Sequence, residues 1–342
     1  MKPRLVIVTD AWHPQVNGVV RTLTHMRDLM SARGYAVTIV SPSDYRSVPC
    51  PTYPEIRLAL THPAAVRAVL AKLQPAYVHI ATEGPLGIMA RRACLRNGWH
   101  FTTSFHTRFP EYLSERFPVV PLSLTYGFLR RFHNAAACTL VPTPSIRDEL
   151  AARGFTHLKV WTRGVDRALF KPKRVDLKLK HPIFLCVGRV APEKNLAAFL
   201  SLDLPGTKLV VGDGPSLAEL KARFPEAVFV GKKEGKELAR YYAGSDVFVF
   251  PSRTDTFGLV LLEAIASGLP VAAYPVPGSQ DVVGATGAGV LSEDLGEACR
   301  EALKMGRIDP DTALKDFTWE HCADIFEGVL TPVVADEQAK AA

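Results

Sequence analysis

Short apolar runs alternate with amphipathic stretches along the chain, and this alternation constrains the fold more than any other feature. In the first half, the predicted strands are residues 5–9, 36–41, 55–58, 77–80, 101–105 and 138–141. Predicted helices lie between them, among them residues 19–33, 64–73 and a stretch ending at Arg96. Strands that alternate with helices form a mostly parallel sheet with both faces covered.

The same pattern restarts after a basic segment, residues 167–182, that contains two prolines and is the predicted linker. The second set of predicted strands is residues 183–187, 208–211, 228–230, 247–250 and 271–274. A length of 342 residues also suits two domains. The sequence therefore predicts two doubly wound, Rossmann-like α/β domains, residues 1–170 and 171–318, facing a cleft that binds the ligand. Residues 319–342 are expected to form a helix and a polar tail that frays.

Charge is divided unevenly between these halves. Residues 1–170 carry 21 Lys and Arg against 10 Asp and Glu, whereas the remainder carries 20 against 24. A basic half suggests an anionic partner, which could be lipid head groups, a phosphorylated substrate or nucleic acid; a solvated basic surface explains the same charge.

Targeting signals and cysteines bear on the compartment. No apolar run approaches the ~20 residues of a membrane-spanning helix, and residues 5–8 are too short for the core of a signal peptide. The six cysteines include no CxxC pair and are expected to be reduced thiols. The expected compartment is the cytoplasm.

Four strand-to-helix loops hold the candidate functional residues. The first is DAWHPQVNG, residues 10–18, in which Gly18 opens a helix. Glycine allows close backbone approach, and the amides at the start of a helix can bind an anion. Ordinary turn chemistry accounts for the Asn-Gly pair equally well.

The second loop, VGRVAPEKN, follows a predicted strand. Gly188 allows a sharp turn, and Arg189 and Lys194 place two cations at the carboxyl edge of the sheet. Two cations beside helix-terminal amides suit a diphosphate. The alternative is a structural ion pair with Glu193.

The third loop places Asp255 after a strand and Glu263 inside an apolar helix. Gly258, near the start of that helix, exposes backbone amides to an anion. A buried carboxylate such as Glu263 needs hydrogen-bond donors, which a ribose diol would supply. The alternative is a Glu263 paired with a nearby Lys or Arg.

The fourth loop, SFHTRFPEY, carries His106 at a strand end, directed toward the predicted cleft. Spacing alone favours a structural or surface role for a single histidine over a catalytic one. The chain holds no GxSxG elbow, HExxH motif or Walker lysine loop.

Together these segments resemble the retaining glycosyltransferases of the GT-B fold in family 4. In the second half the resemblance is carried by VGRVAPEKN, VGDGP and FVFPSRTDTFGLVLLEAIASGLPV. In the first half it is carried by DAWHPQVNGVVRTL, HIATEGPLG, SFHTRFPEY and WTRGVDRALF. These look like the branch with sulfoquinovosyl-, glucuronosyl- and glucosyl-diacylglycerol synthases and GDP-mannose-dependent mannosyltransferases.

The resemblance implies a role for each site residue. The implied catalytic residues are Arg189, Lys194, Asp255 and His106. Arg189 and Lys194 would hold the diphosphate, Asp255 would contact the transferred sugar, and His106 would lie near the sugar and the acceptor. The implied donor-binding residues are Gly18, Gly188, Gly231, Lys232, Thr256, Phe257, Gly258, Leu259 and Glu263. Glu263 would bind the ribose, and Gly231 and Lys232 would line the base pocket. Many relatives have Glu where this chain has Asp255, which puts the sugar selectivity in question.

The implied reaction moves a hexose from UDP-glucose, UDP-glucuronate or GDP-mannose to a hydroxyl acceptor, a membrane lipid such as diacylglycerol, without metal or other cofactor. Alternatives are a non-hydrolysing-type sugar-nucleotide 2-epimerase and a non-catalytic sugar-nucleotide-binding protein; nucleic acid is not an expected partner. Residues 116–133 interleave aromatic and basic residues. One prediction places them on an anionic membrane surface, with the protein peripheral on the inner face of the cytoplasmic membrane. The other prediction is that they form a core helix. The closing helix is expected to pack back on the first domain. Donor, sugar, acceptor and oligomeric state stay open.

Overall fold

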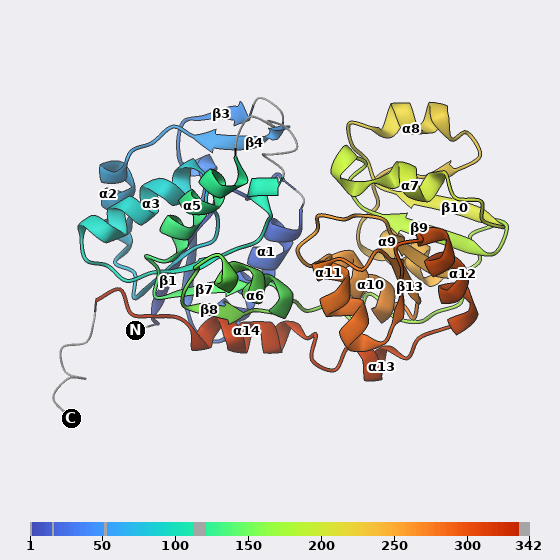
Figure 1. Cartoon of the computed structure of the whole chain (residues 1–342). Helices are drawn as coiled ribbons and strands as arrows, with labels where there is room; N and C mark the ends of the chain where they lie inside the picture. Colours follow the sequence, from blue (N-terminus) through green and yellow to red (C-terminus); the bar gives the residue numbers. More distant parts are fainter. Residues whose placement is uncertain (1, 16, 51–52, 112–120, 335–342) are drawn as a thin grey trace. The chain divides into compact units, whose positions relative to one another are not determined.

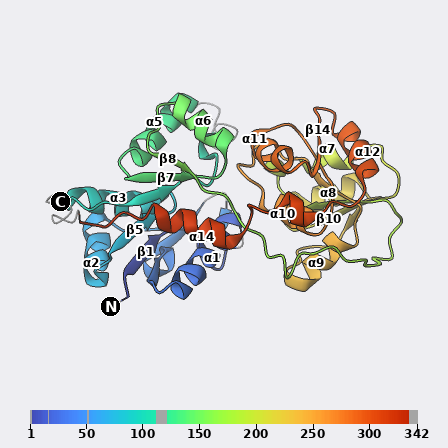
Figure 2. The ribbon, with the colours of Figure 1, turned by 90° about the horizontal axis from the view of Figure 1, so that it is seen from below.

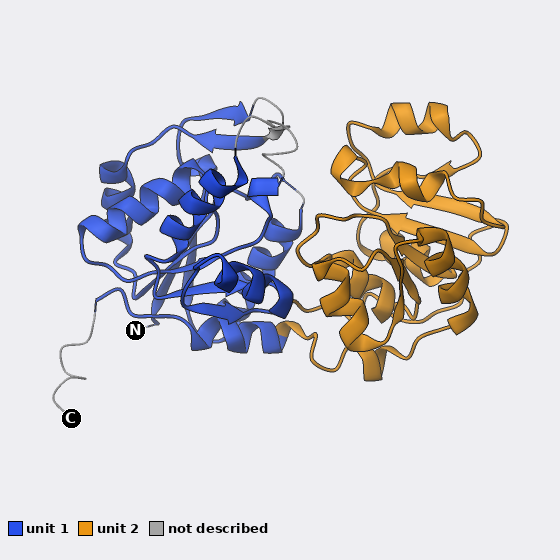
Figure 3. Cartoon of the chain, viewed as in Figure 1, with its two compact units in different colours: residues 1–162, 320–342 blue, residues 163–319 orange. Residues whose placement is uncertain are grey.

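The computed structural model describes residues 2–15, 17–50, 53–111 and 121–334. The chain divides into two compact units (Figure 3): unit 1 is Met1–Thr162 with Glu320–Ala342, and unit 2 is Arg163–Trp319. The first boundary therefore precedes the predicted one, residue 170. The predicted tail, residues 336–342, lies outside the described residues.

Unit 1 is built on a parallel six-stranded sheet in the order β2-β1-β5-β6-β7-β8 (Figure 1). Its strands are β1 (Arg4–Val8), β2 (Ala36–Val40), β5 (Tyr77–Ile80), β6 (Thr102–Ser104), β7 (Cys138–Val141) and β8 (Leu158–Val160). Its helices are α1 (Gly18–Ala32), α2 (Pro63–Leu73), α3 (Pro85–Arg96), α5 (Leu122–His133), α6 (Pro144–Ala152) and α14 (Trp319–Gly328), with the 3₁₀ turn η1 (Pro42–Asp44). An antiparallel pair, β3 (Ser47–Cys50) and β4 (Tyr53–Ala59), stands apart from the sheet.

Alternate residues of the central strands supply two separate cores, because successive strand side chains point to opposite faces. Val6 and Val8 of β1 join a cluster with apolar residues of α2 and α3. On the other face, the ring of His79 in β5 lies edge-on to Phe326 of α14, with centroids 4.9 Å apart. Figure 2 shows α14 running across this side of unit 1. The final helix is thus part of unit 1.

Unit 2 repeats the plan with a parallel sheet in the order β11-β10-β9-β12-β13-β14. Its strands are β9 (Ile183–Val187), β10 (Thr207–Val211), β11 (Val228–Phe229), β12 (Val247–Phe250), β13 (Val271–Ala273) and β14 (Gly289–Leu291). Its helices are α7 (Leu196–Leu200), α8 (Leu217–Arg223), α9 (Gly235–Ala243), α10 (Leu259–Ala266), α11 (Pro277–Ser279), α12 (Leu295–Met305) and α13 (Pro310–Ala313), with the short turns η2 (Pro192–Lys194) and η3 (Gln280–Gly284). Helices α9 and α10 cover one face, and α7, α8 and α12 the other.

The prediction that residues 167–182 form a linker is wrong, because this segment packs against unit 2. Phe170 is buried in the core of unit 2, and Leu177 and Leu179 pack against the same core. The segment therefore lies along unit 2 without regular secondary structure, held by three apolar side chains that its basic composition and prolines obscured.

Helix α5 tests only part of the two predictions for residues 116–133, because the residues before 121 lie outside the described part of the chain. It buries Tyr126, Leu129 and Phe132, and it exposes Leu124 and Phe128. The helix thus has a core face and an exposed face that is partly apolar. Within the described residues, none of the helices is both long enough and apolar enough to span a bilayer.

Candidate functional site

Each sheet has one place where the strand order reverses, and doubly wound folds bind ligands beside such a place. In unit 2 the reversal lies between the neighbouring strands β9 and β12, and in unit 1 between β1 and β5. The loops after β9 and β12 carry most of the predicted donor-site residues.

Those two loops of unit 2 are bonded to each other. The side-chain amide of Asn195 donates to the Pro251 carbonyl at 3.1 Å, and the Ser252 hydroxyl donates to the Glu193 carbonyl at 3.3 Å. The loops therefore form one surface, with the positions of their side chains fixed relative to each other.

Lys194 and Asp255 meet on this surface. The ammonium lies 2.6 Å from Asp255 Oδ1 and 2.8 Å from Oδ2, and both side chains are largely buried. The structural partner that the sequence suggested for Lys194, Glu193, is thus not the one found. A lysine and an aspartate, expected to serve different parts of a ligand, neutralise each other here across 61 positions of sequence.

Arg189 lies on the same loop as Lys194, half-buried and directly after Gly188. The loop after β10 packs backbone to backbone against it: a Cβ on Gly212 would lie 1.8 Å from the Gly188 carbonyl oxygen. The Val190 amide also donates to the Asp213 carbonyl at 2.9 Å. The VGDGP glycines therefore hold the Arg189 loop in place.

Gly258 is the N-cap of α10 and has a φ of +80°, a left-handed conformation that favours glycine. Among the described residues, no side chain caps this helix. Phe257 is buried just before it, with the Arg163 guanidinium 5.9 Å from its ring centroid. Thr256 and Leu259, on either side of the turn, are half-buried. The first turn of α10 thus presents backbone amides rather than a cap, beside the Asp255 loop.

Glu263 lies in the next turn of α10 and is 3% exposed. Its Oε2 accepts a hydrogen bond from the hydroxyl of Tyr242, on α9, at 2.8 Å. Sequence reasoning missed Tyr242, because nothing local to an α9 tyrosine indicates a partner 21 positions away. The phenol fixes the orientation of the carboxylate.

Gly231 and Lys232 follow β11, at the edge of the sheet. The Gly231 carbonyl accepts from the Gly212 amide at 3.0 Å, so this turn is joined through Gly212 to the Gly188 loop. Lys232 is half-exposed and pairs with Glu234 at 2.8 Å. The predicted base-pocket residues therefore lie on the same sheet edge as Arg189, further along it.

The loop that holds Gly18 in unit 1 differs from the expected anion site. The side chain of Asn17 accepts from the amides of both Val19 and Val20 at 3.0 Å. Asp10 accepts from the amides of Leu86 at 2.8 Å and Gly87 at 3.1 Å, at the start of α3.

Side chains of the protein thus accept hydrogen bonds from most of the backbone amides that were predicted to bind a ligand. Burial, the largest effect, raises the pKa of Asp10. A pocket of about 150 Å³ lies beside this loop, and its lining residues are His13, Gln15, Val20, Arg21, Thr24 and His25.

His106 follows β6 in unit 1 and is half-buried, with its ring centroid 5.9 Å from that of the buried Trp161. Below it in the sheet, His79 is fully buried between the hydroxyls of Thr102 at 2.8 Å and Ser104 at 2.7 Å. Burial lowers the pKa of His79 to about 3. His79 is therefore a neutral, structural histidine.

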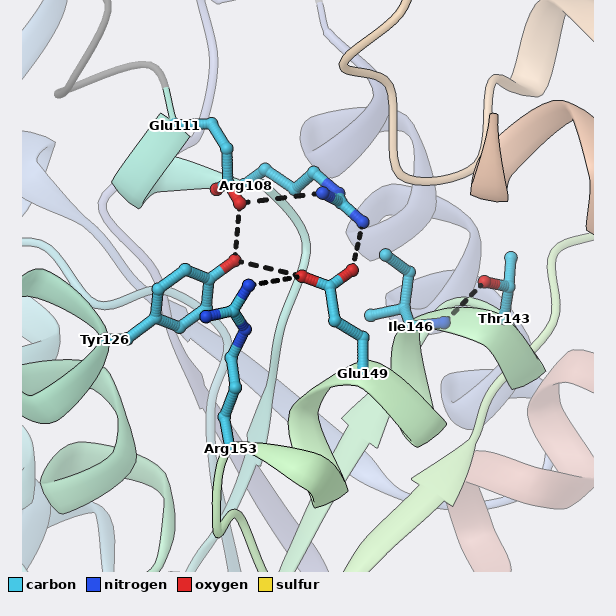
Figure 4. A network of polar contacts seen from close by, with 7 residues as sticks. All are labelled: Arg108, Glu111, Tyr126, Thr143, Ile146, Glu149 and Arg153. Carbon is cyan, nitrogen blue, oxygen red and sulfur yellow. Dashed lines mark hydrogen bonds and ion pairs between the residues drawn. The ribbon is translucent and has the colours of Figure 1, made fainter. Parts of the chain in front are cut away.

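A polar network continues from the His106 loop (Figure 4). Arg108 forms ion pairs with Glu149 of α6 and, at 3.5 Å, with Glu111. The Tyr126 hydroxyl donates to Glu111 at 2.6 Å, and the guanidinium of Arg153 lies 4.0 Å from the Tyr126 ring centroid. Burial and the hydrogen bond to Glu111 raise the pKa of Tyr126. The network ties the loop after His106 to α5 and α6.

The described residues also bear on metal binding. Across the described residues, no group of three or more His, Cys, Asp or Glu is placed to hold a metal ion. The chain has one Asp-x-Asp pair, Asp309 and Asp311, a spacing that can hold a metal–diphosphate complex. Here Asp309 accepts from the Asp311 amide at 3.0 Å at the start of α13, and Asp311 pairs with Arg167. Both carboxylates therefore have structural partners.

Known structures with this arrangement define a class of protein. A sucrose-phosphate synthase from Thermosynechococcus elongatus superimposes with a TM-score of 0.73 at 22% identity, over 96% of this chain and 98% of that one. Anabaena HepE, solved in complex with UDP-glucose, gives a TM-score of 0.69 at 15% identity, over 95% and 99%. The fold is that of the GT-B glycosyltransferases, which confirms the predicted fold class.

Sequence comparison identifies the family. Residues 16–169 match the family described as Glycosyltransferase Family 4, and residues 181–305 match that described as Glycosyl transferases group 1. A GDP-mannose-dependent alpha-mannosyltransferase of Mycobacterium tuberculosis is 31% identical over 306 residues, which are 82% of this chain and 81% of that protein. The chain belongs to glycosyltransferase family 4, as its sequence motifs predicted.

Two further relatives differ in the reactions that they are named for. The sulfoquinovosyl transferase SQD2 of Arabidopsis thaliana is 33% identical over 255 residues, 70% of this chain but only half of that protein. An alpha-monoglucosyldiacylglycerol synthase of Streptococcus pneumoniae is 26% identical over 345 residues, 88% of this chain and 78% of that protein. The family is therefore established, whereas the names of the relatives denote different transferred sugars.

Proposed function

We propose that this glycosyltransferase moves a hexose from a nucleoside-diphosphate sugar to a hydroxyl of a membrane lipid, with retention of the anomeric configuration. The observation that carries the proposal is in unit 2: the Lys194–Asp255 pair lies at the strand-order reversal, beside the uncapped start of α10 and the buried Glu263. A cation, helix-start amides and a buried carboxylate are the groups that a diphosphate followed by a ribose requires.

Donor binding would replace the Lys194–Asp255 pair with two new sets of contacts. The diphosphate, being anionic, competes with Asp255 for the Lys194 ammonium, with Arg189 on the same loop as a second cation. Asp255 is then left as an acceptor for hydroxyls of the transferred sugar. Glu263, held by Tyr242, would accept from the ribose hydroxyls. The ion pair thus keeps both groups in place and neutral in sum until the donor supplies their partners.

The chemical step depends on charge that grows on the leaving diphosphate. The bond from the sugar C1 to the phosphate oxygen breaks, the acceptor oxygen bonds to C1 on the same face, and the acceptor proton passes to the departing phosphate oxygen. Lys194, Arg189 and the amides of α10 would stabilise that growing charge, which is electrostatic catalysis. The proposal needs no protein nucleophile, metal or other cofactor. His106 is proposed to lie near the sugar and the acceptor.

The donor and acceptor classes rest on the relatives. Their printed names include a GDP-mannose-dependent enzyme, a sulfoquinovosyl transferase and a glucosyldiacylglycerol synthase, and a structural neighbour binds UDP-glucose. One of these names, monoglucosyldiacylglycerol synthase, denotes glycolipid synthesis, and the basic charge of residues 1–170 suits an anionic membrane surface. We therefore propose a lipid acceptor, with the protein peripheral on the membrane.

A donor screen tests the proposal. UDP-glucose, UDP-glucuronate and GDP-mannose are each incubated with diacylglycerol and simple lipid acceptors, and products are read by mass spectrometry. One donor should give an acceptor-dependent glycolipid whose anomeric configuration, read by NMR, matches that of the donor. An epimerised nucleotide sugar formed without acceptor would instead indicate the 2-epimerase, and binding without any product would indicate a binding protein.

A further inference from the structure

A pocket of about 220 Å³ lies between α3 and α5, which are neighbours in unit 1 (Figure 1). It is distinct from the strand-end loops described above. Its lining is three arginines and three apolar residues: Ile88, Arg91, Arg92, Phe128, Arg131 and Phe132. The pocket therefore combines three positive charges with an apolar lining.

The position of Arg91 is fixed by α5. Its Nε donates to the Phe132 carbonyl at 3.0 Å, and its Nη2 donates to the Arg131 carbonyl at 2.6 Å. The guanidinium also lies 5.8 Å from the Phe132 ring centroid. Arg91 therefore joins the two helices and makes the wall of the pocket rigid.

The positive charge of this pocket is not neutralised by the described residues. In residues 2–15, 17–50, 53–111 and 121–334, none of the three arginines forms an ion pair with a carboxylate. Burial lowers the pKa of the Arg91 guanidinium, and the like charges of Arg131 and Arg92 lower it further. Three cations held together without a counter-charge from the described residues favour an anion at this position.

The surface next to these cations is apolar. Leu124, Phe128 and Arg131 are spaced by four and three residues and so lie on one face of α5, opposite the buried Tyr126 and Leu129. Leu124 is 67% exposed and Phe128 47% exposed. A free phosphate would leave both side chains without a partner, whereas a phospholipid offers a phosphate to the arginines and acyl chains to Leu124 and Phe128.

We propose that the pocket binds the phosphate of an anionic phospholipid, with Arg92 and Arg131 contacting the head group and Phe128 the acyl region. This site would hold unit 1 on the membrane at a fixed place, rather than through its net charge alone. The inference deepens the proposed function, on which it rests for the presence of a membrane substrate. The occupant is a lipid that is not consumed in the reaction.

The test compares two doubly substituted proteins with equal loss of charge. Arg92→Gln/Arg131→Gln removes two cations from the pocket and leaves the structural Arg91. The control, Lys221→Gln/Arg240→Gln, removes two exposed cations from α8 and α9 of unit 2. Binding is measured by flotation with phosphatidylcholine vesicles, with and without phosphatidylglycerol.

The pocket variant should bind phosphatidylglycerol vesicles roughly 30-fold more weakly than the wild type, since each cation near an anionic surface contributes about fivefold. The control should lose less than about threefold. Phe128→Ser should weaken binding severalfold without changing net charge. Equal losses in the two double variants, or no binding by the wild type, would overturn the proposal.

Two further readouts separate the possible sources of failure. If inorganic phosphate, measured by calorimetry, binds the wild type but not the pocket variant while Phe128→Ser leaves vesicle binding unchanged, the site takes a free anion and the lipid assignment is overturned. Nucleotide binding should be the same in both double variants. A wild type that transfers no sugar but shows the pocket-dependent vesicle binding would refute the proposed function and leave this site standing.

Discussion

The two units are built on the same doubly wound plan but treat the helices that follow their strand-order reversals in opposite ways. In unit 1, Asn17 caps α1 through the amides of Val19 and Val20, and Asp10 occupies amides at the start of α3. In unit 2, among its described residues, the N-cap of α10 is Gly258 and no side chain caps the helix.

This difference indicates where an anionic ligand can be held without breaking a protein contact. Backbone amides at a helix start bind either a capping side chain or an external anion, and not both. At its strand-order reversal, unit 1 satisfies these amides with its own side chains, whereas unit 2 leaves those of α10 beside the Lys194–Asp255 pair. We therefore expect the donor diphosphate to bind unit 2, with the role of Gly18 in unit 1 limited to close approach.

Lys194→Ala should produce the largest effect. It removes a charge that we propose stabilises the leaving group and leaves Asp255 without its ion-pair partner, so turnover at saturating donor should fall about 10²–10³-fold. Steady-state kinetics of glycolipid formation measure this. Lys236→Ala, an exposed lysine on α9, is the matched control and should keep normal turnover. Near-normal turnover of Lys194→Ala would show that the cation has only a structural role.

Glu263→Gln should weaken nucleotide binding by about 10–100-fold, because hydrogen bonds to a charged group contribute about 1.5–3 kcal/mol. Tyr242→Phe, which removes only the group that orients Glu263, should have a smaller effect in the same direction. Calorimetry with the nucleoside diphosphate alone measures both. Glu293→Gln removes an exposed partner of Arg253 and should not change affinity. Unchanged binding by Glu263→Gln would place the ribose elsewhere.

Much of the fold was predictable because punctuation by Gly, Pro and Asp delimits the buried strands. The predicted bounds of β5, β7, β9 and β12 agree with the structure. Strand β3 was not predicted, because Pro49 interrupts a four-residue strand of an antiparallel pair outside the sheet. Strands β8 and β14 have three half-buried or exposed residues each, too few to show a period.

The candidate site was predictable as a set of loops but not as a set of contacts. Chain order and parallel topology place Lys194 and Asp255 on one sheet edge, so the sequence could bring them together. Their mutual ion pair, and the bond from Tyr242 to Glu263, depend on side-chain positions that no local pattern encodes. In unit 1 the capping role of Asn17 was available from its residue type, which is among the preferred N-caps.

Unit 1 also has a fully buried histidine in its sheet, His79, which should make the stability of this unit depend on pH. Unfolded His79 binds a proton below about pH 6.5, whereas the folded protein, in which burial lowers the pKa to about 3, does not. Between these values protons favour the unfolded state, so stability falls as the pH drops. From about pH 6.5 to about pH 5 this one group should cost about 2 kcal/mol.

Urea unfolding followed at both pH values measures that loss in unit 1. His79→Gln, although less stable at neutral pH, should lack the part of the acid dependence that His79 causes. His100→Gln, which replaces an exposed histidine of the same unit, should keep it. An acid dependence that is identical in wild type and His79→Gln would show that other groups set it.

Asn17→Ala is expected to have the smallest effect, and it bears most directly on the difference between the units. Loss of an N-cap should destabilise unit 1 by about 1 kcal/mol while exposing the amides of Val19 and Val20. Thr143→Ala, at the N-cap of α6 in the same unit (Figure 4), should cost a similar amount. If unit 2 alone holds the diphosphate, calorimetric nucleotide affinity should be unchanged in both variants. A change confined to Asn17→Ala would show that the α1 amides contact the donor, and that the cap of unit 1 is released when the donor binds.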